Sequence, residues 1–508
     1  MKTDSPSKTR NESRPIEVGS RRQLFIDDKF IQQQRGIALC VNPPVKAEPV
    51  LVPETVVESH AINVLQVFPV GEEWWMYYSA IPQGNMQYDP ARKDGSGYMV
   101  CLAASRDGLH WQRHNVDLYD VRGRENNVVI PNCYGSLLVD PKMSGGYRYW
   151  FLAQMKQSSV WKHADGCDWS SGLYLLKSKD GIHFERHPGR ALPFYMDSWN
   201  QCLYDQRLQK YVAYVRSWVP GKNRCVSRLE FDDLLSLPWP HQPMDPKRSR
   251  LMINTLIDEV PVVMQADAGD PPSMDLYSSC VHIYGDAPDS VYLAFPSRYR
   301  HYDGFKSYGR DERDRYENNG VLDIALAVSR DGVHWTRFPQ AYVGLGRLGE
   351  VDGGCLYMGL GMISKGDEIW QYCGVKPDRA AYYRQEERVG AILRLLQRQD
   401  GFVSADAGPG GGTLATPLIT FQGNRLTLNI NCGAMGEAWV EIRDATGNPL
   451  PGFTLAESVS VDRNGTAQEV WWRKGPDLSS LSGRPVRLHI KMRCAKLYAF
   501  QFAEATAR

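Results

Sequence analysis

Short apolar and aromatic runs, separated by turn residues, follow one another along most of the chain. The first group has a mostly apolar run at His60–Val70, an aromatic run at Trp74–Ser79 and a third run at Tyr98–Ala104. Runs of this length and composition predict β-strands, and no long stretch shows helical periodicity. An Asp-Gly pair then leads into a short fourth strand at Leu109–Arg113. Asp-Gly between two strand patterns predicts a hairpin.

The Asp-Gly pair belongs to a seven-residue stretch that is written three times, as SRDGLHW at Ser105–Trp111, SKDGIHF at Ser178–Phe184 and SRDGVHW at Ser329–Trp335. The copies begin 178 − 105 = 73 and then 329 − 178 = 151 residues apart, so the second interval is about twice the first. In a weaker copy, Gln397–Val403, the Asp-Gly pair follows that of the third copy by 400 − 331 = 69 residues. A regular period of this kind predicts a repeat architecture.

Four strands in each of five units of roughly 70–75 residues, from about 50 to about 405, predict an all-β fold that begins with a five-bladed β-propeller. Closing a ring of blades removes the unpaired sheet edges that open β structures must protect. The strands predicted for units two to five are Tyr134–Val139, Tyr147–Gln154, Gly172–Leu176, Ile182–Arg186; Asn200–Tyr204, Tyr211–Arg216, Cys225–Phe231; Ser279–Tyr284, Val291–Pro296, Leu322–Val328, Val333–Phe338; and Cys355–Ile363, Glu368–Gly374, Gly390–Leu396.

The pattern changes after the glycine-rich segment Gly408–Gly412, which is typical of a linker. Alternating runs such as Arg425–Asn431 then predict a C-terminal β-sandwich over 413–505. The propeller is predicted over 21–407, and residues 1–20 are polar and are expected to be disordered. An early strand at Leu24–Phe30 either packs on the sandwich or completes a propeller blade.

We interpret the repeated stretch as an outer-edge turn with a structural role. In such a turn Ser or Asp accepts hydrogen bonds from nearby backbone N–H groups, Gly supplies a positive φ, and the final Trp or Phe packs between blades. Its aspartates, Asp107, Asp180 and Asp331, are therefore poor catalytic candidates.

Composition narrows the function classes. The formal net charge of the 508 residues is +1, which provides no electrostatic argument for a nucleic acid or an anionic membrane as partner. Eleven scattered cysteines predict reduced thiols rather than a disulfide framework or a zinc site, and no cofactor or metal motif is present. No apolar run approaches the roughly 20 residues of a membrane span. The N-terminus lacks an apolar signal segment, so we expect a cytoplasmic protein, or a secreted or periplasmic one if the true start lies upstream.

The S-[RK]-D-G-x-H-[WF] repeats, the five units and the trailing sandwich resemble the five-bladed glycoside hydrolase superfamily that includes families 32, 43 and 117. Gly412–Leu418 (GTLATPL) also resembles the opening of the family 32 sandwich module. The family 32 motifs W-x-N-D-P-N-G and R-D-P are absent, which makes this chain a divergent relative. The resemblance implies a glycosidase whose partner is a carbohydrate, with an active site in the propeller funnel.

Side chains at the starts of the first strands are expected to line that funnel. Glycoside cleavage needs a proton donor and a partner carboxylate, about 5–5.5 Å apart for retention or about 6.5–9.5 Å apart for inversion. The carboxylates at such starts are Glu58, Asp197, Asp275, Glu350 and Asp352.

Glu350 and Asp352 share one side of an extended segment, where mutual repulsion would raise one pKa and suit a general acid. We therefore predict Glu350 as acid and either Asp197 or Asp275 as base or nucleophile. For each carboxylate, the alternative is an ordinary turn or solvated loop.

Substrate contacts are predicted from Glu58, His60, Trp199, Tyr277 and Asp352, because aromatic faces stack on sugar rings and polar groups bind hydroxyls. An ordinary core role remains open for each aromatic. A basic group, Arg298, Arg300 and His301, either holds an anionic substrate group or forms surface ion pairs.

Two other functions remain open. In a glycoside phosphorylase, phosphate would replace water as the attacking group, and the basic group would bind it. In a non-catalytic carbohydrate-binding propeller, the carboxylates would lack catalytic spacing. Propellers host many functions, so the fold itself does not choose among the three.

Overall fold

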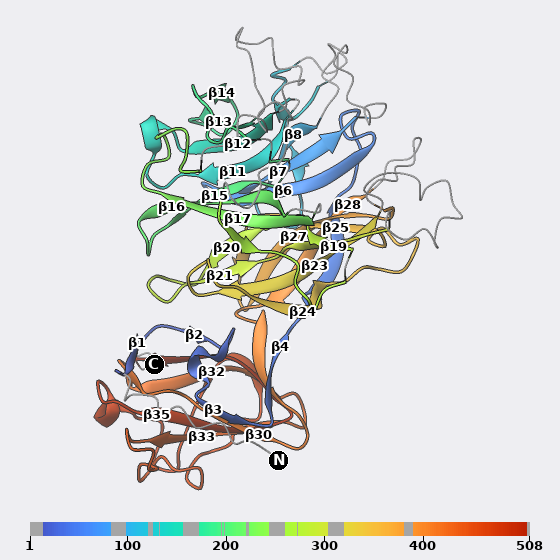
Figure 1. The fold of residues 1–508 in the computed structure, drawn as a ribbon. Coiled ribbons are helices and arrows are strands. Elements are labelled where there is room, and N and C mark those ends of the chain that lie inside the picture. Colours follow the sequence, from blue (N-terminus) through green and yellow to red (C-terminus); the bar gives the residue numbers. More distant parts are fainter. Residues whose placement is uncertain are drawn as a thin grey trace, which may run out of the picture. The chain divides into compact units, whose positions relative to one another are not determined.

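The computed structural model describes residues 14–82, 98–119, 125–131, 133–155, 172–194, 196–197, 199–219, 223–242, 260–271, 273–302, 320–379 and 390–504. The fold is all-β (Figure 1). Only short 3-10 turns interrupt the strands within these ranges, namely η1 (Asp28–Phe30), η2 (Ser144–Gly146) and η6 (Ser479–Leu481). In this described part, no helix has the length and apolar character needed to cross a membrane.

Contacts divide the chain into two compact units, Pro43–Gln397 and the combination of Met1–Asn42 with Arg398–Arg508. The expected propeller range 21–407 was thus too wide at both ends. Residues 21–42 and 398–407 belong to the smaller unit, because their strands complete its sheets.

The larger unit consists of antiparallel groups of neighbouring strands, which we name sheets A to E (Figure 1). Sheet A contains β6 (Ala61–Val70), β7 (Glu73–Ile81), β8 (Met99–Ser105), β9 (Gln112–Arg113) and β10 (Val128–Ile130). Sheet B contains β11 (Tyr134–Val139), β12 (Tyr149–Met155), β13 (Gly172–Ser178) and β14 (Glu185–Arg186). Sheet C contains β15 (Gln201–Asp205), β16 (Lys210–Val219), β17 (Asn223–Phe231) and β18 (Val262–Met264).

Sheet D contains β19 (Met274–Leu276), β20 (Val281–Tyr284), β21 (Val291–Ala294), β22 (Ser297–His301), β23 (Gly320–Ser329) and β24 (Thr336–Val343). Sheet E contains β25 (Cys355–Met358), β26 (Ile363–Lys365), β27 (Glu368–Lys376), β28 (Ala391–Arg398) and β5 (Val45–Leu51). One parallel pair, Leu322 with Cys355, joins D to E. The pair β19–β22 was not predicted, and it extends sheet D beside Asp275.

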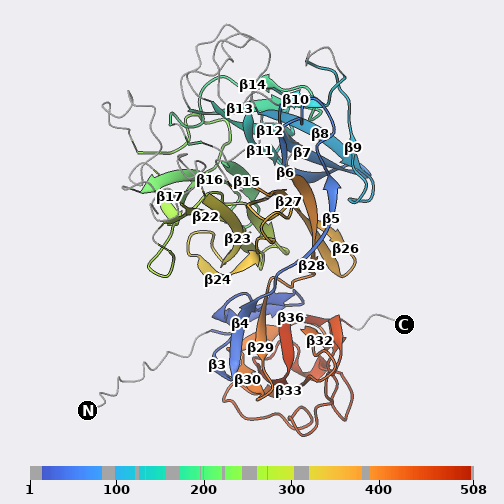
Figure 2. The same cartoon turned by 90° about the vertical axis from the view of Figure 1, so that its right-hand side faces the viewer.

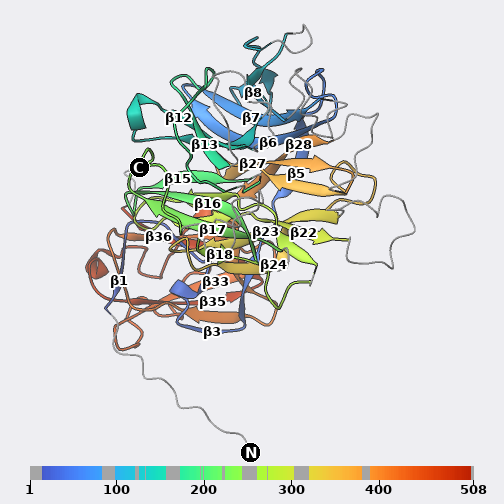
Figure 3. The same ribbon diagram turned by 45° about the horizontal axis from the view of Figure 1, so that its top comes forward.

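Hydrogen bonds link the first strands of successive sheets. Leu137 of B donates to Gln66 of A at 3.2 Å. Ser136 donates to the carbonyl of Asn200, just before C, at 2.7 Å. Gln201 of C exchanges two 2.8 Å bonds with the backbone of Val281 in D. Sheet E in turn contacts A, because the backbone of Leu360 bonds to Leu65 and Val67 at 2.9 and 2.8 Å. Figure 3 shows β27, β28 and β5 side by side at the sheet E end of this series.

The repeated seven-residue stretch forms the predicted turn. In its third copy Ser329 Oγ accepts the N–H groups of Asp331 and Gly332 at 3.3 and 2.8 Å. Asp331 Oδ1 accepts those of Val333 and His334 at 2.8 Å. Gly332 has φ +75°, as the turn requires. The glycine-to-serine bond and the two bonds to aspartate recur in the other copies, which confirms the structural role of this turn.

Each turn is also fastened to the preceding sheet by a tyrosine. The tyrosine hydroxyl donates to the carbonyl of the turn glycine, and its ring packs against the final Trp or Phe of the stretch. The pairs are Tyr372 with Gly108 (2.5 Å) and Trp111, Tyr77 with Gly181 and Phe184, and Tyr214 with Gly332 (3.0 Å) and Trp335. The stretch is therefore repeated because it closes the contact between neighbouring sheets.

Gly332→Ala is expected to lower the free energy of unfolding by about 2 kcal/mol, because overpacking adds to an unfavourable φ. A Cβ there would lie 2.5 Å from the Tyr214 hydroxyl and 2.9 Å from the Tyr292 ring. The control is Gly366→Ala, at φ +60° with no atom within 4 Å of the new Cβ, where about 1 kcal/mol is expected. Urea unfolding measures both changes, and equal losses would contradict the packing argument.

The smaller unit has two antiparallel sheets and a short parallel pair (Figure 2). The first sheet contains β34 (Asn464–Glu469), β32 (Arg425–Asn431), β36 (Ala495–Ala503), β29 (Val403–Ala407), β4 (Ile37–Val41) and β2 (Gln23–Leu24). The second contains β3 (Gln33–Arg35), β30 (Gly412–Ala415), β35 (Arg487–Arg493) and β33 (Glu437–Arg443). The parallel pair is β1 (Ile16–Gly19) with β31 (Ile419–Phe421).

The early segment Leu24–Phe30 packs in this smaller unit, which was the first of its two predicted placements. Its side chains Phe25 and Phe30 are buried in the same core as Leu428, Ile490 and Phe500. The N-terminal strand that completes sheet E is β5 instead, and it pairs with β28.

Candidate active site

A line of aromatic rings runs across the starts of the first strands of sheets B, C and E and along the neighbouring edge of D. Tyr134 begins β11, Trp199 precedes β15, Tyr357 lies in β25 and Tyr277 follows β19. Successive ring centres along this line are 5.3–6.1 Å apart, in the order Tyr98, Tyr134, Trp199, Tyr357, Tyr277, Tyr299. Tyr134, Trp199, Tyr357 and Tyr277 are half-buried, so each presents part of its ring.

Asp197 lies at this line with a buried arginine as its partner. Its Oδ2 accepts a 2.5 Å hydrogen bond from Arg216 Nη1. The Asp197 side chain is 33% exposed, whereas that of Arg216 is 2% exposed. Arg216 also donates to the carbonyl of Tyr277 and lies 4.0 Å from the centre of that ring. The carboxylate is thus oriented from below and open from above.

Asp275 is the second carboxylate, and it is only 1% exposed. Its Oδ2 accepts from Arg224 Nη1 at 2.9 Å and lies 3.1 Å from Nε2 of His301. Its Oδ1 has no hydrogen-bond partner within the described ranges. A buried carboxylate oxygen without a partner is costly, which makes this atom a candidate for contact with a ligand or for proton exchange.

Strand register explains why these groups converge. Asp275 lies opposite Tyr299 in the β19–β22 pair, and His301 lies two residues beyond Tyr299, so all three share one face. Arg224 lies opposite Trp218 in the β16–β17 pair, which places it on the face that carries Arg216. The guanidinium groups of Arg216 and Arg224 therefore both lie over Tyr277, the second at 5.4 Å.

Lys376 and His60 complete the basic side chains near the rings. Lys376 Nζ lies 5.9 Å from the ring centre of Tyr357. Burial lowers the pKa of Lys376 below its usual range. Burial, with a smaller contribution from the charge of Lys376, lowers the pKa of His60 to about 4. His60 is therefore neutral at pH 7.

Asp197 and Trp199 both have a positive φ, +59° and +69°. Such a conformation costs on the order of 1–3 kcal/mol for a residue with a side chain, and it is common at functional sites. Two of them beside one arginine-bound carboxylate mark this segment as one whose shape is held by its surroundings.

Glu58, in contrast, lies in a closed structural arrangement. It is fully buried and accepts from Nε and Nη2 of Arg113 at 2.8 and 2.9 Å, from the Tyr78 hydroxyl at 2.6 Å, and from the N–H groups of Glu54 and Thr55. Burial opposes its charge, but these donors outweigh burial and hold the pKa of Glu58 below its ordinary value. No acceptor position is left for a substrate.

Glu350 and Asp352 are not brought to the aromatic line by any contact among the described residues. Glu350 is exposed and accepts the N–H of Arg347 at 2.7 Å. Asp352 forms an ion pair with Lys46. Lys46 lies on β5, which the order β25-β27-β28-β5 places three strands from Tyr357, or about 14 Å at ordinary strand spacing.

The predicted basic group is divided between the two faces of β22. Arg298 forms a bidentate pair with Asp323 at 2.8 and 2.6 Å, and Arg300 shares its face because side chains alternate. His301 points to the opposite face, toward Asp275. These residues therefore do not form one anion-binding fork, since the period of two separates neighbours along a strand.

The site also contains residues that sequence reasoning did not find, notably Arg216, Arg224, Tyr134, Tyr357 and Lys376. Tyr134 was noted only as a strand start. The two arginines stand within otherwise apolar strand runs, YVAYVRSWV and NRCVSRLEF, and a charge in such a run is a usable signal. No comparable signal marked Tyr357 or Lys376.

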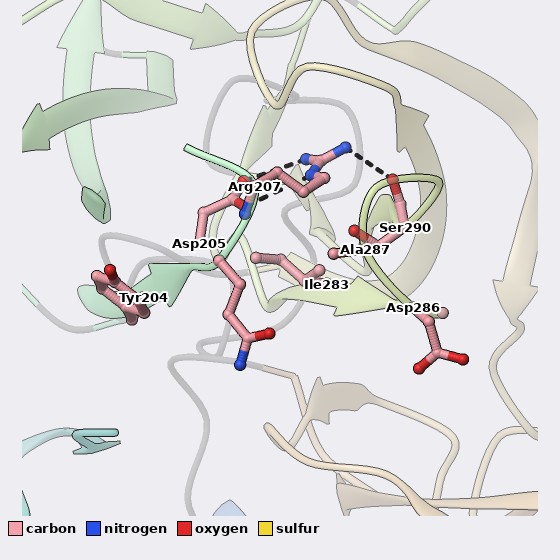
Figure 4. Close-up of a pocket in the computed structure, with 9 residues that line it drawn as sticks. Tyr204, Asp205, Arg207, Ile283, Asp286, Ala287 and Ser290 are labelled. Atoms are coloured by element: carbon pink, nitrogen blue, oxygen red, sulfur yellow. Dashed lines mark hydrogen bonds and ion pairs between the residues drawn. The ribbon is translucent and has the colours of Figure 1, made fainter. Parts of the chain in front are cut away.

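A cavity of about 340 Å³ lies elsewhere, at the turns that end β15 and β20. Figure 4 shows Arg207 between Asp205 and Ser290 on its wall. Asp205 is fully buried and also accepts from Tyr292. Its polar groups serve one another, so we assign it no chemistry. Within the described ranges, no group of three or more His, Cys, Asp or Glu side chains could hold a metal ion.

The neutral His60 predicts a pH dependence of stability. The unfolded chain binds a proton near pH 6.5, whereas the folded protein binds it only near pH 4, so stability should rise as the pH increases from 4 to 6.5 and then level off. The contribution is about 3 kcal/mol. Urea unfolding across this range should show a shallower rise in His60→Asn, while the exposed control His114→Asn keeps the wild-type slope. Equal slopes in all three proteins would contradict the assignment.

Comparison with known proteins gives limited matches in sequence. No family model matches the chain. The uncharacterized protein MT1551 of Mycobacterium tuberculosis (strain CDC 1551 / Oshkosh) is 25% identical over 125 residues, which cover 23% of this chain. The match spans 35% of that protein's length.

Among solved structures, three similar chains illustrate the range. A glycoside hydrolase has a TM-score of 0.43 at 15% identity, covering 70% of this chain and 92% of its own. A glycosyl hydrolase from Bacteroides ovatus has a TM-score of 0.42 at 13% identity, covering 76% and 99%. An N-acetylgalactosamine deacetylase from F. plautii, in complex with blood group B trisaccharide, has a TM-score of 0.43 at 13% identity, covering 72% and 96%.

Proposed function

We propose that this protein cleaves glycosidic bonds of an oligo- or polysaccharide at the aromatic line, with Asp197 and Asp275 as the pair of carboxylates. One observation carries the proposal. Two aspartates from different sheets, each held by its own arginine, meet beside half-buried aromatic rings. Aromatic faces suit the apolar side of a sugar ring, and paired carboxylates suit acid–base cleavage of the bond.

We further propose that the larger unit is a five-bladed β-propeller and the smaller unit a β-sandwich. Sheets A to E support the first assignment, because their first strands are linked in series and E returns to A. A single core shared by two antiparallel sheets supports the second. In such a propeller the starts of the first strands surround one funnel mouth, where side chains from several blades can act on one substrate.

The two aspartates are given different roles in this proposal. Asp197 acts as base or nucleophile, because it is partly exposed and Arg216 orients it. Asp275 carries the proton for the leaving oxygen on Oδ1, the atom that lacks a partner. Asp275 takes the role first predicted for Glu350, whose contacts lie in a turn. Carboxyl groups about 5–5.5 Å apart would retain the anomeric configuration, and about 6.5–9.5 Å would invert it.

Phosphorolysis is the second candidate, and the concentration of basic groups supports it. Arg216, Arg224 and Lys376 all lie near Tyr277 or Tyr357, so an oxyanion could be held there. These groups replace the predicted set of Arg298, Arg300 and His301 as the proposed anion site. In this reaction phosphate would attack the anomeric carbon in place of water.

Product release from neutral, uronic and sulfated oligosaccharides, with and without phosphate, tests the proposal. Release in plain buffer supports a hydrolase and identifies the sugar. Release that needs phosphate supports the phosphorylase. Binding without release under either condition would contradict both and favour a carbohydrate-binding propeller.

A further inference from the structure

Asn200 is a buried amide next to the two residues of positive φ, and the chemistry above does not use it. It is 1% exposed. Its Nδ2 donates to the backbone carbonyl of Asp197 at 2.8 Å. Its Oδ1 accepts the backbone N–H of Arg216 at 3.0 Å. One side chain thus joins the backbone of the carboxylate to the backbone of the arginine that binds it.

These bonds form a closed circuit of three residues. Arg216 holds the carboxylate of Asp197 at 2.5 Å, Asn200 holds the carbonyl of Asp197, and Asn200 is held by the N–H of Arg216. Ser136 of sheet B adds a 2.7 Å bond to the carbonyl of Asn200. A carbonyl fixed on one side and a carboxylate fixed on the other leave Asp197 little freedom to rotate its backbone.

Positive φ at Asp197 and Trp199 needs such a restraint. Neither residue is a glycine, and a free chain would return each to negative φ. A return would rotate the Asp197 carboxylate away from Arg216 and the Trp199 ring away from Tyr357, with which it stacks at 6.1 Å. Carboxylate and ring therefore depend on the same restraint.

We propose that Asn200 is a positioning residue, which holds Asp197 and Trp199 in their positive-φ conformations and so sets the carboxylate and the sugar-stacking ring together. The kinetic part of this inference rests on the proposed glycoside cleavage, whereas the conformational part does not. Asn at this position is required for its two-sided amide, because the carbonyl of Asp197 needs a donor and the N–H of Arg216 needs an acceptor.

The test compares Asn200→Ala and Asn200→Asp with Gln201→Ala. Gln201 is a matched control, because it is a neighbouring buried amide that exchanges its two bonds with the Val281 backbone and has no recorded bond to Asp197. Crystal structures of each variant report φ at 197 and 199. Rates are measured on the p-nitrophenyl glycoside that the wild type cleaves fastest in a panel of such glycosides, and are divided by the folded fraction.

We expect Asn200→Ala to lose positive φ at both positions and to lower kcat/KM at least tenfold, mainly through kcat. Asn200→Asp keeps the acceptor but loses the donor, so its rate should fall between those of Asn200→Ala and the wild type. Gln201→Ala should lower Tm and keep kcat.

Positive φ retained in Asn200→Ala at both positions would overturn the proposal whatever the rate, and so would loss of positive φ with kcat unchanged. If Asn200→Ala does not fold, the structure of Asn200→Asp decides by the same criterion. If the wild type cleaves no glycoside of the panel, the proposed function fails on its own, and φ in the variants still decides the conformational part.

Discussion

Asp197→Asn is expected to lower kcat/KM by at least about a thousandfold, within the range usual for loss of an acid–base group. The substitution removes the charge that Arg216 orients and leaves the shape of the side chain almost unchanged. Asn also tolerates positive φ better than most residues, so the backbone at position 197 should persist. The measurement is the initial rate on the glycoside identified by product release, per folded molecule.

Asp275→Asn should give a loss of similar size for a different reason. The amide cannot carry the proton assigned to Oδ1, and it leaves the Arg224 charge without its anion. Asp323→Asn is the matched control, since Asp323 also forms a close pair with an arginine, Arg298, on the opposite face of β22. An equal loss in the control would show that any broken Asp–Arg pair impairs the protein, and would contradict the assignment of Asp197 and Asp275.

Glu58→Gln should produce the largest loss of stability among these variants, about 3 kcal/mol or more. Glu58 is the buried anion for Arg113 and also accepts from Tyr78 and two backbone N–H groups. The amide leaves the charge of Arg113 uncompensated and turns one acceptor into a donor that faces donors. Urea unfolding at pH 7 measures the change, and the cleavage rate per folded molecule should remain that of the wild type.

The sign of the pH dependence provides a second check on Glu58. Its folded pKa is lowered, so its contribution to stability is present above the unfolded value of about 4.3 and is lost as the pH falls through the lower folded value. The deficit of Glu58→Gln should therefore shrink below about pH 4. Glu350→Gln, at an exposed carboxylate with one backbone bond, should change stability by less than about 0.5 kcal/mol. A deficit as large as that of Glu58→Gln would contradict this reading.

The repeated turn was predictable in detail because all its bonds are local. Ser329, Asp331 and Gly332 satisfy one another within a few residues, so the letters alone define the hydrogen bonds and the positive φ. Its fastening by Tyr214 was not predictable, because Tyr214 lies more than a hundred residues away in the chain. The letters indicated that an aromatic packs there, but not which partner it meets.

The candidate site shows the same division. Asp197 and Asp275 were found because a carboxylate directly before a strand is visible in one window of sequence. Arg216 and Arg224 were missed as their partners, because each pairing depends on which strand neighbours which, and in what register. The division of Arg298 from His301 was open to sequence reasoning, since alternation along a strand already separates residues three apart.

The sequence by itself determined the all-β class, the positions of most strands and the structural role of the repeated turn. These follow from local periodicity and from bonds between near neighbours. The tertiary structure decided which carboxylates meet the aromatic rings, that Glu58 is enclosed by donors, and that β5 rather than Leu24–Phe30 completes sheet E. Those outcomes depend on burial and on pairing between distant strands, which arise only when the sheets assemble.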